Sequence, residues 1–339
     1  MAVTIKDIAK VANVSHTTVS RALRDHPAIA PRTAERIRQI AEDLGYIPNT
    51  AARGLKTSRS GILGVIVRRI VDPFFSEVLQ GIEDVLQAHS YSLFLAASHR
   101  DPDRERVIIQ AMSERRVDGV IICSTQVSQQ QQRRLAAFNV PTVLINNQAP
   151  EDVTHSIYLD AVSGSREVTE YLVGLGHRRI GYLGNLRGGR TNIDRLRGYR
   201  QALNTAGIRQ RPDYLQEASS GLAAGGAEAA SAFLRLSEPP TAIVCYNDVM
   251  AIGALQVLQS AGVKVPEQCA VTGFDNIELS AYVTPPLTTF SQPKYELGRE
   301  AALMMLRLLE SSDGDAGDDV RTLRGTLIIR SSTAPPPDN

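Results

Sequence analysis

The chain has 339 residues, of which 43% are hydrophobic and 22% are charged. A single hydrophobic core rarely grows beyond about 250–300 residues, so this length predicts two or three domains. No run of about 18 apolar residues occurs, and the opening MAVTIKDIAK lacks the apolar region of a secretory signal peptide. We therefore expect a cytoplasmic protein with no membrane span.

The charges are unevenly distributed along the chain. Residues 1–60 contain ten Lys and Arg against five Asp and Glu, whereas the rest of the chain has 27 against 31. A basic N-terminal module on a mildly acidic body suggests that only the first part binds a polyanion. Cys123, Cys245 and Cys269 lie far apart in apolar runs, which indicates buried thiols in a reducing compartment, with neither a zinc site nor disulfides.

Three short helices are expected in the N-terminal module. The first follows Thr4, where TIKD (4–7) has the pattern of a capping box, and it ends at Asn13. Ser15 caps the second helix, SHTTVSRAL (15–23). Pro31 lies in the first turn of the third helix, which Gly45 terminates.

The second helix presents a short polar row at its N-terminal end. Val19 and Leu23 can pack inward, which leaves compact hydrogen-bonding side chains exposed. These are Ser15, His16, Thr17, Ser20 and Arg21. Such a helix suits a helix-turn-helix domain, whose second helix enters the major groove of DNA. A small helical domain with a hydroxyl-rich surface is the alternative.

The segment PNTAARGLK (48–56) begins like a helix but is too short to be stable by itself. Asn49 is a suitable N-cap, yet few residues separate it from Gly54 and the linker-like run KTSRSG (56–61). Isolated helices shorter than about 12–15 residues are marginal in water. The single large apolar side chain, Leu55, has no apolar neighbour at helical spacing, so packing within the segment does not explain it.

From residue 62 onward, strand-like apolar runs alternate with helical stretches. The first series of runs is ILGVIV (62–67), SLFLAA (92–97), GVIICS (119–124) and PTVLIN (141–146), and the second is IYLD (157–160), RIGYLG (179–184), TAIVCYN (241–247) and CAVTGFD (269–275). Helices are expected at 74–89, 102–115, 128–138, 163–175, 192–206, 222–236 and 248–261. Two series of βα units predict two doubly wound subdomains with parallel sheets.

Polar groups follow several of these runs, at the strand ends where doubly wound folds bind ligands. They are Ser124, Asn146, Asn147, Asn247, Asp248, Asp275 and Asn276, together with DPFF (72–75) after the first run. Asp, Asn, Arg and flat aromatic side chains suit a polyhydroxylated ligand in a cleft between two lobes. Each Asn or Asp taken alone could equally cap the next helix, as Asp248 could.

No catalytic constellation stands out. The glycine-rich GNLRGGRTN (184–192) lacks the Gly-Lys-Ser/Thr ending of a phosphate-binding loop, and no Gly-x-Ser-x-Gly motif occurs. The six histidines have no metal-ligand spacing, and His177 is expected to interact with a helix end. We therefore expect neither an enzyme nor a metal or other cofactor.

Three motifs occur in order in the head of the chain: TIKDIA, VSxxTVSRAL and LGYxPNxxARxL. They resemble the head of the lactose/galactose-repressor (LacI/GalR) family. The resemblance implies a homodimer that reads a pseudo-palindromic operator in double-stranded DNA. The residues it places on DNA are Thr4, Ser15, His16, Thr17, Ser20 and Arg21 in the head, and Asn49, Ala52, Arg53, Leu55 and Lys56 in a hinge helix. His16 and Thr17 would select bases, and Leu55 would wedge into the minor groove.

The body carries further motifs of the same family, including DPFFSEVLQGIE, VDGVIICS, LVGLGHRRIGYLG, YNDVMAIGAL and TPPLTTFSQPKYELGREAA. They resemble its periplasmic-binding-protein-like core. The resemblance implies effector contacts at Phe74, Phe75, Ser124, Asn146, Arg195, Asn247 and Asp275. It also implies a repressor of carbohydrate-metabolism genes whose operator affinity a sugar-like effector controls. A solute-binding protein for sugar transport shares this architecture and is the alternative.

These observations predict four parts. Residues 1–47 form an all-α helix-turn-helix DNA-binding domain, and residues 48–61 a hinge helix and linker. Residues 62–333 form an α/β effector-binding and dimerisation core, with an N-subdomain at about 62–159 and 292–321 and a C-subdomain at about 160–291 and 322–333. Residues 334–339 are expected to be a frayed tail. The resemblance implies action on nucleoid DNA.

Overall fold

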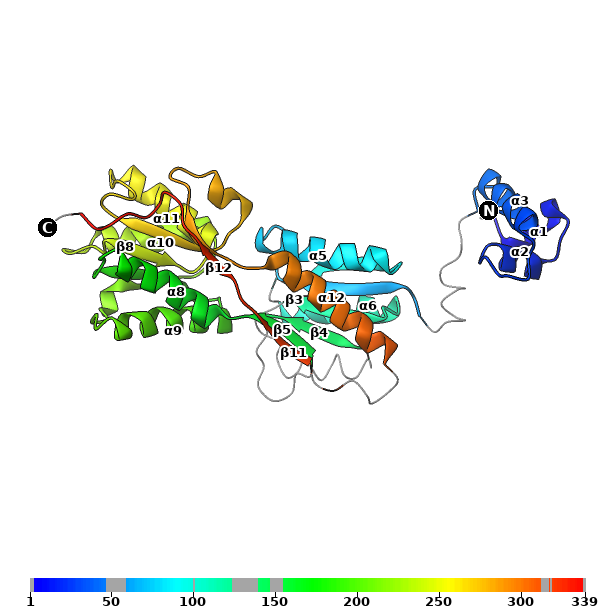
Figure 1. Ribbon diagram of the computed structural model, residues 1–339, viewed down its shortest axis with the longest axis horizontal. Helices are drawn as coiled ribbons and strands as arrows, with labels where there is room; N and C mark the ends of the chain where they lie inside the picture. Colours follow the sequence, from blue (N-terminus) through cyan, green and yellow to red (C-terminus); the bar gives the residue numbers. More distant parts are fainter. Residues whose placement is uncertain are drawn as a thin grey trace. The chain divides into compact units, whose positions relative to one another are not determined.

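The computed structural model describes residues 3–46, 59–99, 101–123, 140–146, 155–311, 317 and 319–337. The chain divides into two compact units, residues 1–60 and 61–339, which we call the head and the core (Figure 1). Each is described by itself. The helix expected at 128–138 and the segment 48–56 lie outside the described residues.

The head contains the three helices expected from the sequence, α1 (Ile5–Ala12), α2 (His16–Ala22) and α3 (Pro31–Asp43). Helix α1 ends because Asn13 adopts the left-handed conformation, with φ of 51°, and Gly45 follows α3 at φ of 65°. Ile8, Val19 and Ile37 are fully buried where the three helices meet. Packing of all three helices therefore holds the seven-residue α2 in place, since so short a helix is marginal alone.

The first lobe of the core is built on a parallel six-stranded sheet with the order β11-β5-β4-β3-β1-β2. Its strands are β1 (Ile62–Val67), β2 (Ser92–Ala97), β3 (Gly119–Cys123), β4 (Thr142–Ile145), β5 (His155–Leu159) and β11 (Asp319–Leu323), and its helices are α5 (Phe74–Ala88), α6 (Pro102–Glu114) and α12 (Lys294–Glu310). Leu63, Val65 and Val67 of β1 belong to one buried cluster and Ile66 to another, so both faces of the sheet are covered.

The second lobe is built on a sheet with the order β12-β10-β9-β8-β6-β7. Its strands are β6 (Ile180–Asn185), β7 (Leu215–Ala218), β8 (Ala242–Cys245), β9 (Ala270–Asp275), β10 (Thr288–Ser291) and β12 (Thr326–Ile328), and its helices are α8 (Ala161–Gly174), α9 (Arg190–Thr205), α10 (Ala223–Leu234) and α11 (Asp248–Ser260). Strand β12 is antiparallel to β10, which corrects the expectation of a purely parallel sheet. Only two residues separate it from β11, so no crossover helix precedes it.

The chain passes between the two lobes three times (Figure 1). The passages lie between β5 and α8, between β10 and α12, and between β11 and β12. All three are short, which leaves each lobe with its own buried clusters and joins the lobes by narrow connections.

The end of the described chain is bonded to the second lobe. The hydroxyl of Ser332 donates to the carbonyl oxygen of Val271 at 2.6 Å. His177 is fully buried, and its ring bonds to the carbonyl oxygen of Ala334 and the hydroxyl of Thr241, each at 2.9 Å. The backbone N–H of His177 donates to the carbonyl oxygen of Leu172 in the last turn of α8, so His177 is the expected helix-end partner. Its side chain in addition anchors residue 334, which the sequence had assigned to a frayed tail. Burial lowers the pKa of His177.

Candidate effector pocket and DNA-binding helix

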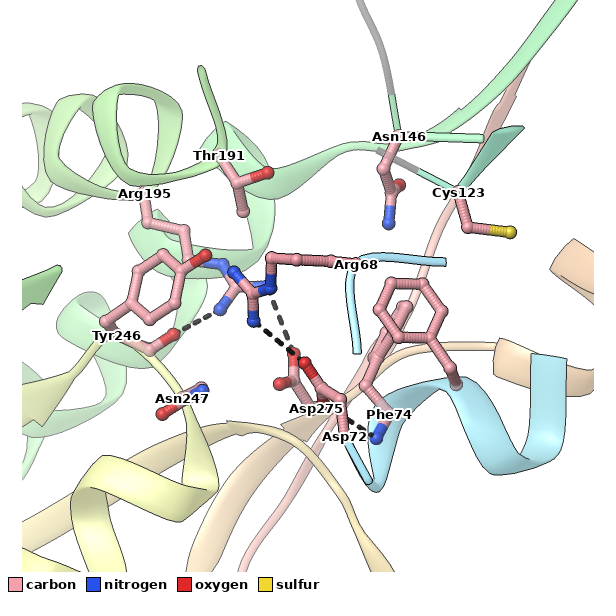
Figure 2. A pocket seen from close by; sticks show the side chains of 11 residues that line it. Arg68, Asp72, Phe74, Cys123, Asn146, Thr191, Arg195, Tyr246, Asn247 and Asp275 are labelled. Carbon is pink, nitrogen blue, oxygen red and sulfur yellow. Dashed lines mark hydrogen bonds and ion pairs between the residues drawn. The ribbon is translucent and has the colours of Figure 1, made fainter. Parts of the chain in front are cut away.

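A pocket lies between the two lobes, beyond the carboxyl ends of strands from both sheets (Figure 2). Its cavity volume is about 60 Å³. Its lining residues are Arg68, Asp72, Phe74, Phe75, Cys123, Asn146, Thr191, Arg195, Tyr246, Asn247 and Asp275. Six of the seven effector residues predicted from the sequence are thus brought together, and Ser124 lies outside the described residues.

Arg195 and Asp275 form a buried ion pair in the second lobe. Nη2 of Arg195 lies 3.1 Å from Oδ1 of Asp275, and the residues are 5% and 6% exposed. Nη1 donates to the carbonyl oxygen of Tyr246, and the guanidinium carbon lies 3.9 Å and 4.7 Å from the ring centroids of Phe274 and Tyr246. Helix α9 and the end of β9 therefore hold the pair in one geometry, which lowers the cost of ordering it around a ligand.

One carboxylate oxygen of Asp275 is available to a ligand. Its Oδ1 accepts hydrogen bonds from Arg195 and Gln292, whereas no described residue donates to Oδ2. Burial raises the pKa of Asp275 to about 6, with the Arg195 guanidinium acting against this rise and the nearby Asp72 carboxylate adding to it. Asp72 and Asp275 line the same pocket, so the first lobe brings a charge close to Asp275.

Arg68, Asp72 and two aromatic rings form the first-lobe side of the pocket. Nη2 of Arg68 lies 2.8 Å from Oδ2 of Asp72, and Oδ1 of Asp72 accepts the backbone N–H of Phe74 at 3.2 Å. Asp72 therefore fixes the chain as it enters α5. The rings of Phe74 and Phe75 meet edge to face, with centroids 5.2 Å apart, and both lie in the buried cluster of the first lobe.

Two polar residues at the end of β8 serve the fold. Asn247 caps α11 through Oδ1, and its Nδ2 donates to the carbonyl oxygen of Gly221 at 3.1 Å, so both ends of its amide are engaged. Asp248 is not the cap that the sequence suggested. It is fully buried and accepts the N–H of Ile277 at 2.8 Å and the hydroxyl of Thr289 at 2.5 Å. Burial raises the pKa of Asp248 to about 8.

Reasoning from the sequence missed several residues of this site. They are Arg68, Cys123, Thr191 and Tyr246 in the pocket lining, and Gln292 and Lys294, which hold Asp275. Arg68 could have been found, because it directly follows β1. Gln292 and Lys294 follow β10, a strand that the sequence did not reveal.

Helix α2 of the head exposes most of the predicted polar row. His16, Thr17 and Arg21 are exposed, whereas Val19 and Ala22 are buried. Ser15 is exposed and caps the helix, because its Oγ accepts the backbone N–H of Thr18 at 3.0 Å. The first turn of α2 therefore offers an imidazole and hydroxyls at its surface, as a recognition helix requires.

Two other predicted DNA contacts are engaged within the head. The hydroxyl of Ser20 is half-buried and accepts a hydrogen bond from the guanidinium of Arg24, which leaves its proton free. The backbone N–H and the hydroxyl of Thr4 both donate to the carboxylate of Asp7, at 2.8 Å and 2.6 Å. These bonds hold the pKa of Asp7 below its usual value, and the Thr4 hydroxyl has no proton left for a phosphate.

The remaining predicted DNA contacts belong to the hinge. Asn49, Ala52, Arg53, Leu55 and Lys56 lie outside the described residues. Within the part of the chain that the structure describes, no group of three or more His, Cys, Asp or Glu side chains could hold a metal ion. Nor does any described helix have the length and apolar character needed to cross a membrane.

Two protein-family models match the chain. The model described as bacterial regulatory proteins, lacI family, matches residues 4–49, which include the three head helices. The model of the periplasmic binding protein-like domain matches residues 169–333, which include β6 to β12.

Named relatives match nearly the whole chain. The HTH-type transcriptional repressor CytR of Escherichia coli (strain K12) is 36% identical over 336 residues, 98% of this chain and 96% of the relative. The HTH-type transcriptional repressor PurR of Aliivibrio fischeri (strain MJ11) is 33% identical over 332 residues, 97% and 98% of the two chains.

Solved structures match the fold of the head and the core. A crystal structure of the lac repressor dimer bound to operator and the anti-inducer ONPF has a TM-score of 0.88 at 26% identity, over 98% of this chain and 100% of that chain. A complex of the transcriptional regulator CelR with cellobiose has a TM-score of 0.75 at 26% identity, over 97% and 99%. With its helix-turn-helix head and two-lobed effector-binding core, the chain belongs to the LacI family of bacterial transcriptional repressors.

Proposed function

We propose that this repressor binds a pseudo-palindromic operator as a homodimer, and that a sugar-like small molecule bound between its lobes controls operator affinity. The observation that carries the effector part is the buried Arg195–Asp275 pair. Nε of Arg195 has no partner, and Oδ2 of Asp275 accepts no hydrogen bond from a described residue. A ligand hydroxyl can donate to this carboxylate oxygen, whereas Nε of Arg195 is buried away from the pocket.

The similar structures support both partners. The CelR structure contains cellobiose, and the lac repressor structure is a dimer on its operator. The aromatic rings of Phe74 and Phe75, which line the pocket, suit the apolar face of a sugar ring. We therefore place the effector in the carbohydrate class and the regulated genes in carbohydrate metabolism, with the protein acting on cytoplasmic, nucleoid DNA.

Control of DNA binding would pass through the connections between the lobes. An effector that touches Phe74 in one lobe and Asp275 in the other favours one relative position of the lobes over another. The coupling between effector and operator is reciprocal, so each changes the affinity of the other by the same factor. Release of DNA on effector binding would identify an inducer, and tighter DNA binding a corepressor.

On the DNA side, α2 supplies base contacts and cations supply salt-dependent affinity. His16 and Thr17 would read base edges in the major groove, and Arg21 would bind phosphate. The hinge residues Asn49, Ala52, Arg53, Leu55 and Lys56 would bind the minor groove at the operator centre.

A thermal-shift screen of sugars, sugar acids, sugar phosphates and purines tests the effector assignment. The hit should lose affinity at least tenfold in Arg195→Ala and in Asp275→Ala. Arg200→Ala, an exposed arginine on the same helix, is the matched control and should leave affinity unchanged. Unchanged affinity in both pocket variants would place the effector elsewhere.

Gel shifts with genomic fragments test the operator assignment. Sequence-specific binding at physiological salt that changes with the hit supports a ligand-controlled repressor. Weak binding to every fragment, with or without the hit, would support the solute-binding alternative.

We also propose that the protein does not transform its effector, so nuclear magnetic resonance spectra of the hit should be unchanged after incubation.

A further inference from the structure

The effector pocket has more free hydrogen-bond donors than free acceptors. Arg68 is partly exposed and, among the described residues, is bonded only to Asp72 through Nη2, so most of its N–H groups remain available. Arg195 donates once from Nη1 and once from Nη2, which leaves a second N–H on each of these nitrogens, while its Nε is buried. The hydroxyl of Thr191 also has no partner among the described residues.

The acceptors of the same pocket are largely engaged. Both oxygens of Asp72 accept hydrogen bonds, from Arg68 and from the backbone N–H of Phe74. Oδ1 of Asn247 accepts from the first turn of α11, and Oδ1 of Asp275 accepts from Arg195 and Gln292. A neutral sugar accepts and donates through every hydroxyl, and the acceptors that remain for its protons include Oδ2 of Asp275 and the Asn146 side chain, which accept from no described residue. A ligand group that only accepts fits this lining better.

We propose that the effector carries a carboxylate or phosphate group and that Arg68 and Arg195 bind this group from the two lobes. The proposal rests on the function proposed above and narrows its ligand class to sugar acids and sugar phosphates. A guanidinium has five donors, so each arginine can hold its own aspartate and a ligand oxygen at once. Charge-assisted hydrogen bonds of this kind are about twice as strong as neutral ones.

Because the two arginines lie in different lobes, an anion bound by both would affect the relative position of the lobes and so the operator affinity. Arg68 follows β1 in the first lobe, and Arg195 lies on α9 in the second lobe; Figure 2 shows their side chains entering the pocket from different sides. An anion bound by both would favour the lobe position that brings the guanidinium groups together. The uncharged parent sugar lacks this link, so Arg68 is a specificity-determining residue.

Matched ligand series test the proposal by isothermal titration of the full chain. The series are glucose, gluconate and glucose 6-phosphate, and ribose and ribose 5-phosphate. In at least one series the anionic member should bind tenfold or more tightly than the neutral sugar, and the two anions of the first series separate carboxylate from phosphate. Arg68→Gln should abolish this preference, Arg68→Lys should retain part of it, and Arg200→Gln should retain all of it. Equal affinity for neutral and anionic members, or a preference that survives in Arg68→Gln, would overturn the proposal.

Inorganic phosphate provides a probe that does not depend on the sugar. At constant ionic strength set with chloride, phosphate should raise the melting temperature of the wild type and of Arg200→Gln more than that of Arg68→Gln, each measured against its own ligand-free value. Equal shifts in all three proteins would overturn the proposal. If a neutral sugar controls operator binding, the proposed function stands and only the proposal of an anionic effector is refuted. If phosphate stabilises the protein but no ligand changes operator binding, only the proposed control of operator affinity by a ligand is refuted.

Discussion

Lys294 donates a hydrogen bond of 2.7 Å to the backbone carbonyl oxygen of Asp275 and so joins a helix of the first lobe to the pocket edge of the second. The same ammonium donates to the carbonyl oxygen of Asn276 at 2.7 Å and lies 3.1 Å from a carboxylate oxygen of Glu77 on α5. Lys294 is only 2% exposed, and these three acceptors match its three N–H donors. Lys294 therefore positions the turn that carries the pocket carboxylate.

Replacing Lys294 by methionine should lower the free energy of unfolding of the core by roughly 2–4 kcal/mol. The reason is that two buried carbonyl groups lose their partner, at about 1–3 kcal/mol for each unsatisfied group. Urea-induced unfolding measures the change. The effector affinity should fall as well, because the Asp275 carboxylate is carried by the released turn.

Glu77→Gln is the control for this prediction. The Glu77 side chain is 51% exposed, so water screens its ion pair with Lys294 and its loss should cost less than about 1 kcal/mol. Equal destabilisation by the two variants would show that the ion pair, rather than the carbonyl contacts, makes Lys294 important.

His177→Ala should release the end of the chain from the second lobe. The change removes the bonds to Ala334 and Thr241 and opens a cavity, so we expect about 2–4 kcal/mol of destabilisation and faster proteolysis after residue 330. Burial lowers the pKa of His177, so its unfolded state binds more protons, and its contribution is present above the ordinary pKa of 6.5 and lost as the pH falls. His89→Ala, which removes one hydrogen bond to the Val85 carbonyl oxygen at an exposed position, should change stability much less.

Periodicity predicted most of the elements that are long or strongly apolar, but it missed α12, which has 17 residues. The runs 62–67 and 92–97 match β1 and β2 in full, and Asn13 and Gly45 end their helices as expected. Strands β7 and β12 were missed because they have only four and three residues, and neither is fully buried. The antiparallel direction of β12 follows from the passage of the chain between the lobes after β11, and a local sequence pattern cannot predict such a passage.

Asn146, which follows β4, and Asp275, the last residue of β9, were found from their places at strand ends and line the pocket. The role of Asn247 could not be settled from the sequence, because pocket lining and helix capping need the same amide at the same place. Lys294 was inaccessible to such reasoning, since its partners Asp275 and Glu77 come from opposite lobes and distant parts of the chain.

Leu55→Ala should weaken operator binding while effector binding persists. Leu55 lies outside the described residues, and the prediction rests on the sequence of the hinge segment. Burial of a leucine side chain contributes about 1.5–3 kcal/mol, so roughly ten- to a hundredfold of affinity should be lost if the side chain wedges between base pairs. Gel shifts measure the operator affinity, and calorimetry with the effector shows whether the core is intact. Equal operator affinity would refute the wedge.

Asp248→Asn should flatten the pH dependence of core stability. Asp248 is buried beside Asp275, Lys294 and the Thr289 hydroxyl, and burial raises its pKa to about 8 from an ordinary 3.8. The folded state therefore binds more protons than the unfolded state between these values, so stability is greatest below about pH 4 and is lost as the pH rises toward 8. The slope for one group is at most about 1.4 kcal/mol per pH unit.

The amide introduced by Asp248→Asn can accept from the N–H of Ile277 and donate to the hydroxyl of Thr289, as a protonated carboxyl can. The variant should therefore match the wild type below about pH 4, where the Asp248 carboxyl is protonated in both the folded and the unfolded state, and its advantage in stability should grow from pH 5 to pH 8. Urea unfolding at pH 5, 6, 7 and 8 measures both curves. Parallel curves would show that Asp248 does not titrate in this range, because only a group that changes its protonation differently in the two states can alter the slope.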